Sequence, residues 1–153
     1  EVKSGYTSFY LGARSVCPSA TMKVTYTNSW FDIALEREAA LKLINDGCVL
    51  ISQHADSEGA PKACEEKGVP NVAYNVNTIS MGPNTAIISS KIYWAPYFKM
   101  MYEAAVNGTA VPADYTGLSR TVWFSSQSST PLLLLKAHRL NLTKLRLSSK
   151  QVL

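Results

Sequence analysis

Two polar turns in the first half of the chain carry residues whose types suit ligand recognition. The turn at residues 27–32 follows an extended apolar run and contains two adjacent aromatic residues, Trp30 and Phe31. The turn at residues 53–57 follows the next apolar run and contains Asp56. An aromatic face stacks on a planar ring, and a carboxylate accepts hydrogen bonds from hydroxyl groups. The turns therefore predict a ligand-binding module without catalytic apparatus.

Strand-like and helix-like segments alternate along the first 108 residues, which places these turns at the edge of a sheet. The alternation predicts βαβ units and an α/β fold with a doubly wound, mainly parallel sheet. Ligands of such sheets bind in the crevice at the carboxyl ends of the strands. The predicted helices are residues 3–16, 33–45, 59–67 and 95–106, and the predicted strands are residues 22–26, 48–51, 70–74 and 86–89.

Local signals define the ends of several predicted helices. Asp32 suits the N-cap of the second helix and Gly47 its C-terminal cap. Pro61 suits the first turn of the third helix and Gly68 its end, while Asn107 and Gly108 end the fourth. The second helix is expected to bury the apolar side formed by Ile33, Leu35, Ala39, Ala40, Leu43 and Ile44.

Composition excludes several classes of protein. At 153 residues with 46% hydrophobic and 17% charged residues, the chain is one soluble-type globular domain. It contains no apolar run of 18 residues and opens with no signal peptide. Its three cysteines and two histidines lack metal-ligand spacing, so no metal and no cofactor are expected. A nucleophile dyad of His54 and Cys64 lacks an orienting acid, and no phosphate-binding glycine loop or nucleophile elbow is present.

The net charge of +4 is unevenly distributed along the chain. From Arg120 onward there are six basic residues and no acidic one, whereas residues 1–119 hold 9 basic and 11 acidic residues. A uniform basic face is therefore absent, and no nucleic acid partner is expected.

Four motifs in order give the chain a resemblance to a known family. They read TNSWFD at residues 27–32, QHADS at 53–57, AYNVN at 73–77 and YWAPY at 93–97. In these motifs residues 1–117 resemble the basic membrane protein family, whose PnrA-like and Med-like members are substrate-binding lipoproteins of ABC transporters. The resemblance implies the type I periplasmic-binding fold, in which hinge closure clamps a ligand between two α/β lobes. It further implies that this chain corresponds to the second lobe, that the full-length protein is extracytoplasmic and lipid-anchored, and that its partner is an ABC permease.

The resemblance also implies roles for five ligand-binding residues. Trp30 or Phe31 would stack on a nucleobase, and Asp56 would lie near the base or sugar. Asn75 stands where the family often has an aspartate for the ribose hydroxyls, and Trp94 would line the far wall. Each residue also has a structural interpretation, since Trp94 suits a core position and Asp56 and Ser57 suit a helix cap. His54 is expected to be a structural turn residue.

The tail at residues 118–153 does not resemble the family. It is basic and rich in serine and leucine, whereas family members end in an acidic, alanine-rich segment. Reading permitted codons for residues 119–148 in a shifted frame yields a family-like end, so a one-base frameshift near Leu118 is one hypothesis. If the tail is genuine, its apolar and basic residues suit a sheet edge, a homodimer or an anionic membrane surface. An extension without function is the plainer alternative.

The residues and the resemblance together predict part of an ABC importer's solute-binding component. The expected solute is a purine nucleoside or a similar heteroaromatic compound, held in a cleft between two lobes. One alternative is a small nucleoside-processing enzyme on the same fold, which requires a titratable pair in the crevice. Another alternative is a non-binding relic that oligomerises through its tail.

Overall fold

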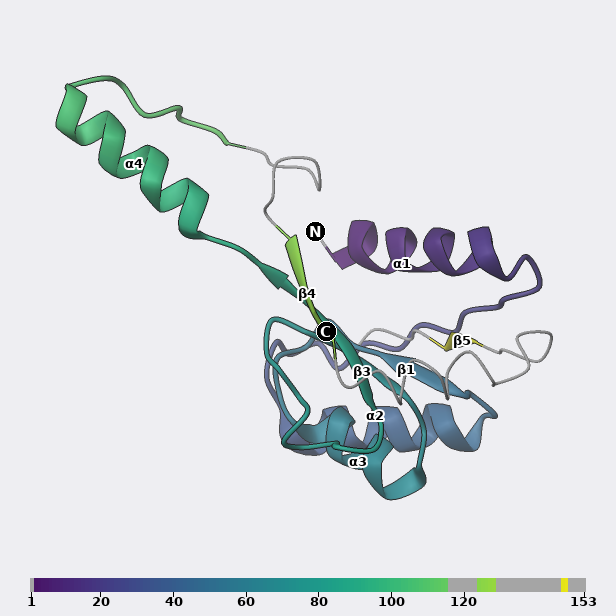
Figure 1. Ribbon diagram of the computed structural model, residues 1–153. Coiled ribbons are helices and arrows are strands. Elements are labelled where there is room, and N and C mark those ends of the chain that lie inside the picture. The colour runs from purple at the N-terminus through teal and green to yellow at the C-terminus, as the bar shows by residue number, and fades with distance from the viewer. Residues whose placement is uncertain (1, 116–123, 129–146, 149–153) are drawn as a thin grey trace.

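The computed structural model describes residues 2–115, 124–128 and 147–148 (Figure 1). Helices and strands alternate through most of this length. The helices are α1 (Val2–Val16), α2 (Ile33–Asn45), α3 (Gly59–Lys67) and α4 (Ala95–Asn107). The strands are β1 (Leu50–Ser52), β2 (Asn71–Tyr74), β3 (Ala86–Ile92), β4 (Phe124–Ser128) and β5 (Leu147–Ser148).

The strands form one sheet in the order β4-β3-β2-β1-β5. Strands β1, β2 and β3 are parallel neighbours, with Ile51 opposite Asn71 and Tyr74 opposite Ser90. Strand β5 adds to β1 in parallel, and β4 adds to β3 in antiparallel orientation. Since β1 and β2 run in the same direction, the loops that follow them meet at one edge of the sheet. The predicted α/β fold with a parallel sheet is confirmed.

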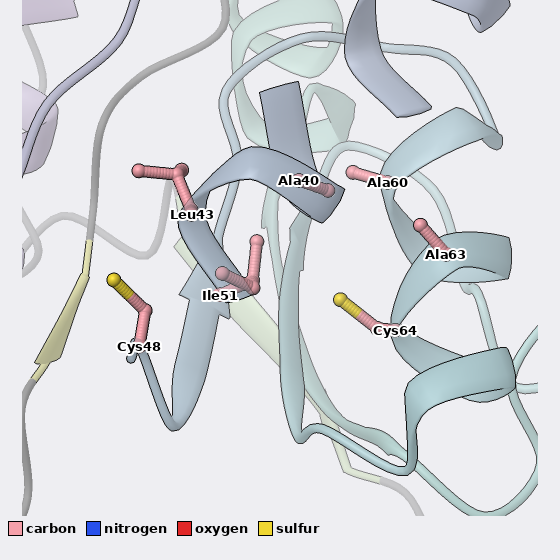
Figure 2. Packing of buried hydrophobic residues seen from close by; sticks show 7 residues of the cluster. All are labelled: Ala40, Leu43, Cys48, Ile51, Ala60, Ala63 and Cys64. Atoms are coloured by element: carbon pink, nitrogen blue, oxygen red, sulfur yellow. The ribbon is translucent and has the colours of Figure 1, made fainter. Parts of the chain in front are cut away.

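Helices cover both sides of this sheet. Figure 1 shows α2 and α3 together on one side and α1 on the other. Helices α2 and α3 pack closely because Gly59 has no side chain. A Cβ atom built there would lie 2.2 Å from the Ile33 carbonyl oxygen. Small residues fill the core beneath the sheet, as Figure 2 shows, and its buried members are Ala40, Leu43, Cys48, Ile51, Ala60, Ala63 and Cys64.

Most capping and glycine signals marked the helix ends correctly, but the C-cap of α2 is Asp46 rather than the predicted Gly47. The Asp32 carboxylate accepts a hydrogen bond of 2.9 Å from the Leu35 amide, as an N-cap residue does. Helices α3 and α4 both end before a glycine in the left-handed conformation, Gly68 and Gly108. Helices α1, α2 and α3 match their predicted ranges to within one residue, and α4 extends one residue past its predicted end.

Two expectations about local structure were wrong. Residues 22–26 form no strand, because the edge of β1 away from β2 is paired with β5 instead. Ile33 and Leu35 are 44% and 42% exposed, so they do not belong to the buried side of α2. Glu36 takes that inward position and is fully buried, because hydrogen bonds that the helical pattern does not reveal hold it there.

Candidate functional site

Three of the predicted ligand residues are joined by hydrogen bonds at the carboxyl edge of the sheet. The Asn75 side-chain amide, just after β2, donates to the Asp56 carboxylate, after β1, over 3.0 Å. The Asp56 backbone amide donates to the Trp30 carbonyl oxygen over 2.9 Å. The loops around Trp30, Asp56 and Asn75 are therefore connected by hydrogen bonds, although only the loops of Asp56 and Asn75 follow strands.

Two asparagines of these loops have an uncommon backbone conformation. Asn28 has a φ of 58° and Asn75 a φ of 62°, and they are the positive-φ residues other than glycine in the described ranges. Asparagine tolerates this left-handed region better than most residues, yet such conformations persist only where the surroundings impose them. The backbone amide of Asn75 donates a separate hydrogen bond to the Ser90 carbonyl oxygen of β3 over 2.8 Å. The loops of Trp30 and Asn75 thus each contain a residue with an unusual backbone conformation.

The aromatic pair of the first loop is open to solvent. Trp30 is 53% exposed and Phe31 is 62% exposed. Large aromatic residues are usually well buried in folded proteins, so two neighbouring exposed rings at a polar edge are informative. The sequence predicts that one ring of this pair lies in the core, and this expectation is wrong because both rings are largely exposed.

Trp94 lies apart from this hydrogen-bonded edge. It is 53% exposed and precedes α4, so the alternative of a core position is wrong. Its ring lies 6.1 Å from that of Tyr97 and 6.3 Å from that of Phe98, both on α4. Figure 1 shows α4 extending away from the sheet. The structure therefore brings Trp30, Asp56 and Asn75 together and places Trp94 in a separate aromatic group.

Sequence reasoning missed two polar side chains that shape the loop after β1. Gln53 is buried and donates to the carbonyl oxygens of Ala55 and Ser57 over 3.0 and 3.1 Å. Glu36 is buried, and its Oε1 accepts from the backbone amides of Asp32 and Ser57 over 3.1 and 3.3 Å. Burial raises the pKa of Glu36, and the nearby Asp56 charge raises it further. The signal for Glu36 was its place four residues after the N-cap Asp32, close to a capping-box spacing.

The remaining polar residues of the second loop have structural roles. The Ser57 hydroxyl accepts from the Gly59 amide over 3.2 Å, but the N-cap residue of α3 is Glu58, so neither Asp56 nor Ser57 occupies the predicted cap position. The His54 ring lies 4.6 Å from the Tyr74 ring, and a Cβ atom built on Gly5 of α1 would lie 2.2 Å from the His54 ring. His54 is thus packed between α1 and β2, in keeping with a structural turn residue.

The described part of the chain contains no metal-binding cluster, and its Cys64 thiol is not activated. No group of three potential metal ligands occurs there. Cys64 is fully buried in the core, and this burial raises the pKa of its thiol to about 12. At neutral pH it is therefore protonated and unsuited to nucleophilic attack. In the same ranges, no helix has the length and apolar character needed to cross a membrane.

A shallow depression of about 580 Å³ lies beside the edge, along α2. None of the five predicted ligand residues lines it. We regard the carboxyl edge of the sheet as the stronger candidate site, because it combines exposed aromatic rings, a hydrogen-bonded carboxylate and residues with a positive φ. The depression along α2 is open to solvent and is lined by both polar and apolar residues. Its lining residues are Thr25, Tyr26, Thr27, Leu35, Glu38, Ala39, Leu41, Lys42, Asn45 and Asp46.

Known proteins resemble the chain over the region that holds these loops. A purine-binding protein of Brucella abortus is 37% identical over 109 residues, which are 71% of this chain and 31% of that protein. A Haloferax volcanii protein named as an ABC transporter glucose-binding protein is 38% identical over 109 residues, 71% of this chain and 28% of its own length. The chain thus spans about a third of the length of these curated relatives.

A solved structure and a family model agree with these relatives. An ABC transporter solute-binding protein from Conexibacter woesei has the same fold, with a TM-score of 0.60 and 20% identity. The match covers 86% of this chain and 46% of that one. Residues 1–116 match the family model described as ABC transporter substrate-binding protein PnrA-like. The chain therefore belongs to the PnrA-like family of ABC transporter substrate-binding proteins, as its four motifs implied.

Proposed function

We propose that the carboxyl edge of this sheet binds a purine nucleoside or a similar heteroaromatic solute for an ABC importer. The observation that supports this most is the hydrogen-bonded connection from Asn75 through Asp56 to Trp30. It holds a carboxylate beside the loop that carries two exposed rings. Stacking on Trp30 or Phe31 would bind the base, and the Asp56 carboxylate would accept hydrogen bonds from ring or sugar donors. The purine-binding relative from Brucella supports the same class of solute.

The solute would be enclosed by a further lobe of the full-length receptor. The chain covers 46% of the solved relative and smaller shares of the curated ones, so half or more of each relative lies outside the match. Of the residues in α4, only Ala104 is buried, and Phe98, Tyr102 and Val106 are 63%, 71% and 65% exposed. A helix with such an apolar surface suits a packing partner. We assign this surface to the other lobe, with Trp94 at the cleft between them and an extracytoplasmic, membrane-anchored setting.

The enzyme alternative has weaker support. The two turns at residues 27–32 and 53–57 offer Asp32, His54 and Asp56 as titratable groups. Asp32 caps α2, His54 is packed between α1 and β2, and Asp56 is bonded to Asn75. These contacts give the three groups structural roles, and the family consists of transporter binding proteins. The third alternative, oligomerisation through residues 118–153, lies outside the described residues apart from the backbone of β4 and β5.

Calorimetric titration with adenosine, guanosine, adenine and riboflavin tests the proposal. Trp30→Ala should weaken binding of the preferred solute by about tenfold or more, because stacking contributes roughly 1–3 kcal/mol per base. Tyr102→Ala is the matched control, since it removes an exposed aromatic residue of α4 away from the edge. Heat from none of the four solutes, or equal affinity for the parent and Trp30→Ala, would contradict the proposal.

A further inference from the structure

We propose that Glu36 is the positioning residue of the ligand edge, fastening the loop that carries Trp30 to the loop that carries Asp56. One carboxylate oxygen, Oε1, accepts from the Asp32 amide at the end of the first loop and from the Ser57 amide in the second. This inference rests on the proposed function for its biological meaning. The coupling of the loops itself can be measured without any solute.

The geometry gives Glu36 a role that helix formation does not require. The first turn of α2 is already capped by Asp32, whose carboxylate accepts from the Leu35 amide over 2.9 Å. Glu36 reaches back to the Asp32 amide, as the glutamate of a capping box does, but one position later in the helix. The same oxygen also reaches Ser57, which is 21 residues further along the chain. A local cap would not need this second, long-range bond.

The burial of Glu36 lowers the stability that this position could provide, so a role beyond packing is indicated. Its side chain is fully buried, although glutamate is among the residues least often buried without a partner. Its second oxygen, Oε2, has no hydrogen-bond partner within the described part of the chain. A buried polar atom of this kind costs free energy that an apolar residue at the same position would avoid. The two amides bonded to Oε1 would in turn be left unpaired by an apolar residue.

The link acts directly on the proposed ligand residues. Ser57 is adjacent to Asp56, whose own amide is bonded to the Trp30 carbonyl oxygen over 2.9 Å. Asp32 is adjacent to Phe31 in the first loop. Glu36 and the bond from Asp56 to Trp30 therefore form two parallel connections between the loops. Without Glu36, the hydrogen bond from the Asp56 amide to the Trp30 carbonyl oxygen would remain as a link between the two loops, but the links through Asp32 and Ser57 would be lost.

Amide hydrogen exchange on two near-isosteric variants of the full chain separates this role from simple packing. Glu36→Gln keeps an accepting oxygen, whereas Glu36→Met keeps the size and removes the acceptor. We expect Glu36→Met to speed exchange in residues 29–32 and 55–57 by about tenfold or more, since both amides lose their acceptor. Glu36→Gln should stay within about threefold of the parent. The core control Cys64→Ala should lower stability without selective loosening of either loop.

Two results would overturn the coupling. One is equal loop exchange in the parent and Glu36→Met, and the other is loosening in Glu36→Gln as large as in Glu36→Met. If Glu36→Met does not fold, exchange is measured on the parent chain alone. The coupling requires slow exchange of the Asp32 and Ser57 amides, and fast exchange of either amide would contradict it. Adenosine titration of the same proteins then tests the link to function, with weaker binding expected for Glu36→Met. Failure of the parent to bind any solute would remove the proposed function and leave the coupling of the loops standing.

Discussion

The Asp56 carboxylate is the residue on which solute selectivity would depend. Asn75 donates to its Oδ1 over 3.0 Å, which helps to hold the carboxylate in place. If Asp56 binds the solute as proposed, Asn75 would act on the solute through this hydrogen bond.

A pH series on Glu36→Gln tests the buried carboxyl group at the residue scale. Burial raises the folded-state pKa of Glu36, and the neighbouring acidic groups are Asp56, which raises it further, and the N-cap Asp32. A raised folded pKa means that the stabilising contribution is present at low pH and is lost as the pH rises through that pKa. We therefore expect the melting temperature of Glu36→Gln, relative to the parent, to increase from acidic to neutral pH. A constant difference, measured by calorimetry, would contradict this.

Sequence reasoning predicted the residues of the edge better than the residues that support it. Asp56 and Asn75 follow β1 and β2, so chain order indicated that they share an edge. The same argument for Trp30 and Phe31 relied on a strand at residues 22–26 that the structure does not contain. Glu36 was missed because its burial depends on the Ser57 amide, a contact between residues distant in the chain. Trp94 was expected on the far wall of a cleft, and its position relative to a solute stays a prediction.

At the scale of helices, the stability of the lobe depends on close packing of α2 against α3. Gly59→Ala should destabilise the chain by about 1–3 kcal/mol, because the added Cβ atom would meet the Ile33 carbonyl oxygen. Gly12→Ala is the matched control, since a Cβ atom there meets nothing within 4 Å on the helix α1. It should be neutral or stabilising by up to about 1 kcal/mol. Chemical denaturation measures both, and equal effects would contradict the packing account.

The elements were predictable where local chemistry defines their ends. Gly68, Gly108 and the N-cap Asp32 ended or began helices as expected, because caps act within a single turn. Residues 22–26 were not predictable in the same way, because a strand exists only if a neighbour offers a free edge. That segment is tied to the helices by side chains instead, with Lys23 pairing Asp46 at 3.3 Å.

At the scale of the whole molecule, α4 should contribute little to the stability of this chain. Its exposed apolar residues are assigned to another lobe, so replacing Phe98, Tyr102 and Val106 together by serine should shift the melting temperature by less than about 2 °C. Binding of a hydrophobic fluorescent dye should fall in the same variant, because the exposed apolar surface is removed. A large drop in melting temperature would mean that α4 packs on the body of the lobe.

The most direct test of the central claim is a nuclear magnetic resonance titration of the labelled chain with adenosine. The account predicts shifts of the Trp30 indole and of the Asp56 and Asn75 amides, which belong to one hydrogen-bonded edge. The resonances of Tyr102 on α4 serve as the internal reference. Shifts confined to the depression around Leu35 and Lys42, or no shifts in any described residue, would contradict the claim that the carboxyl edge is the ligand site.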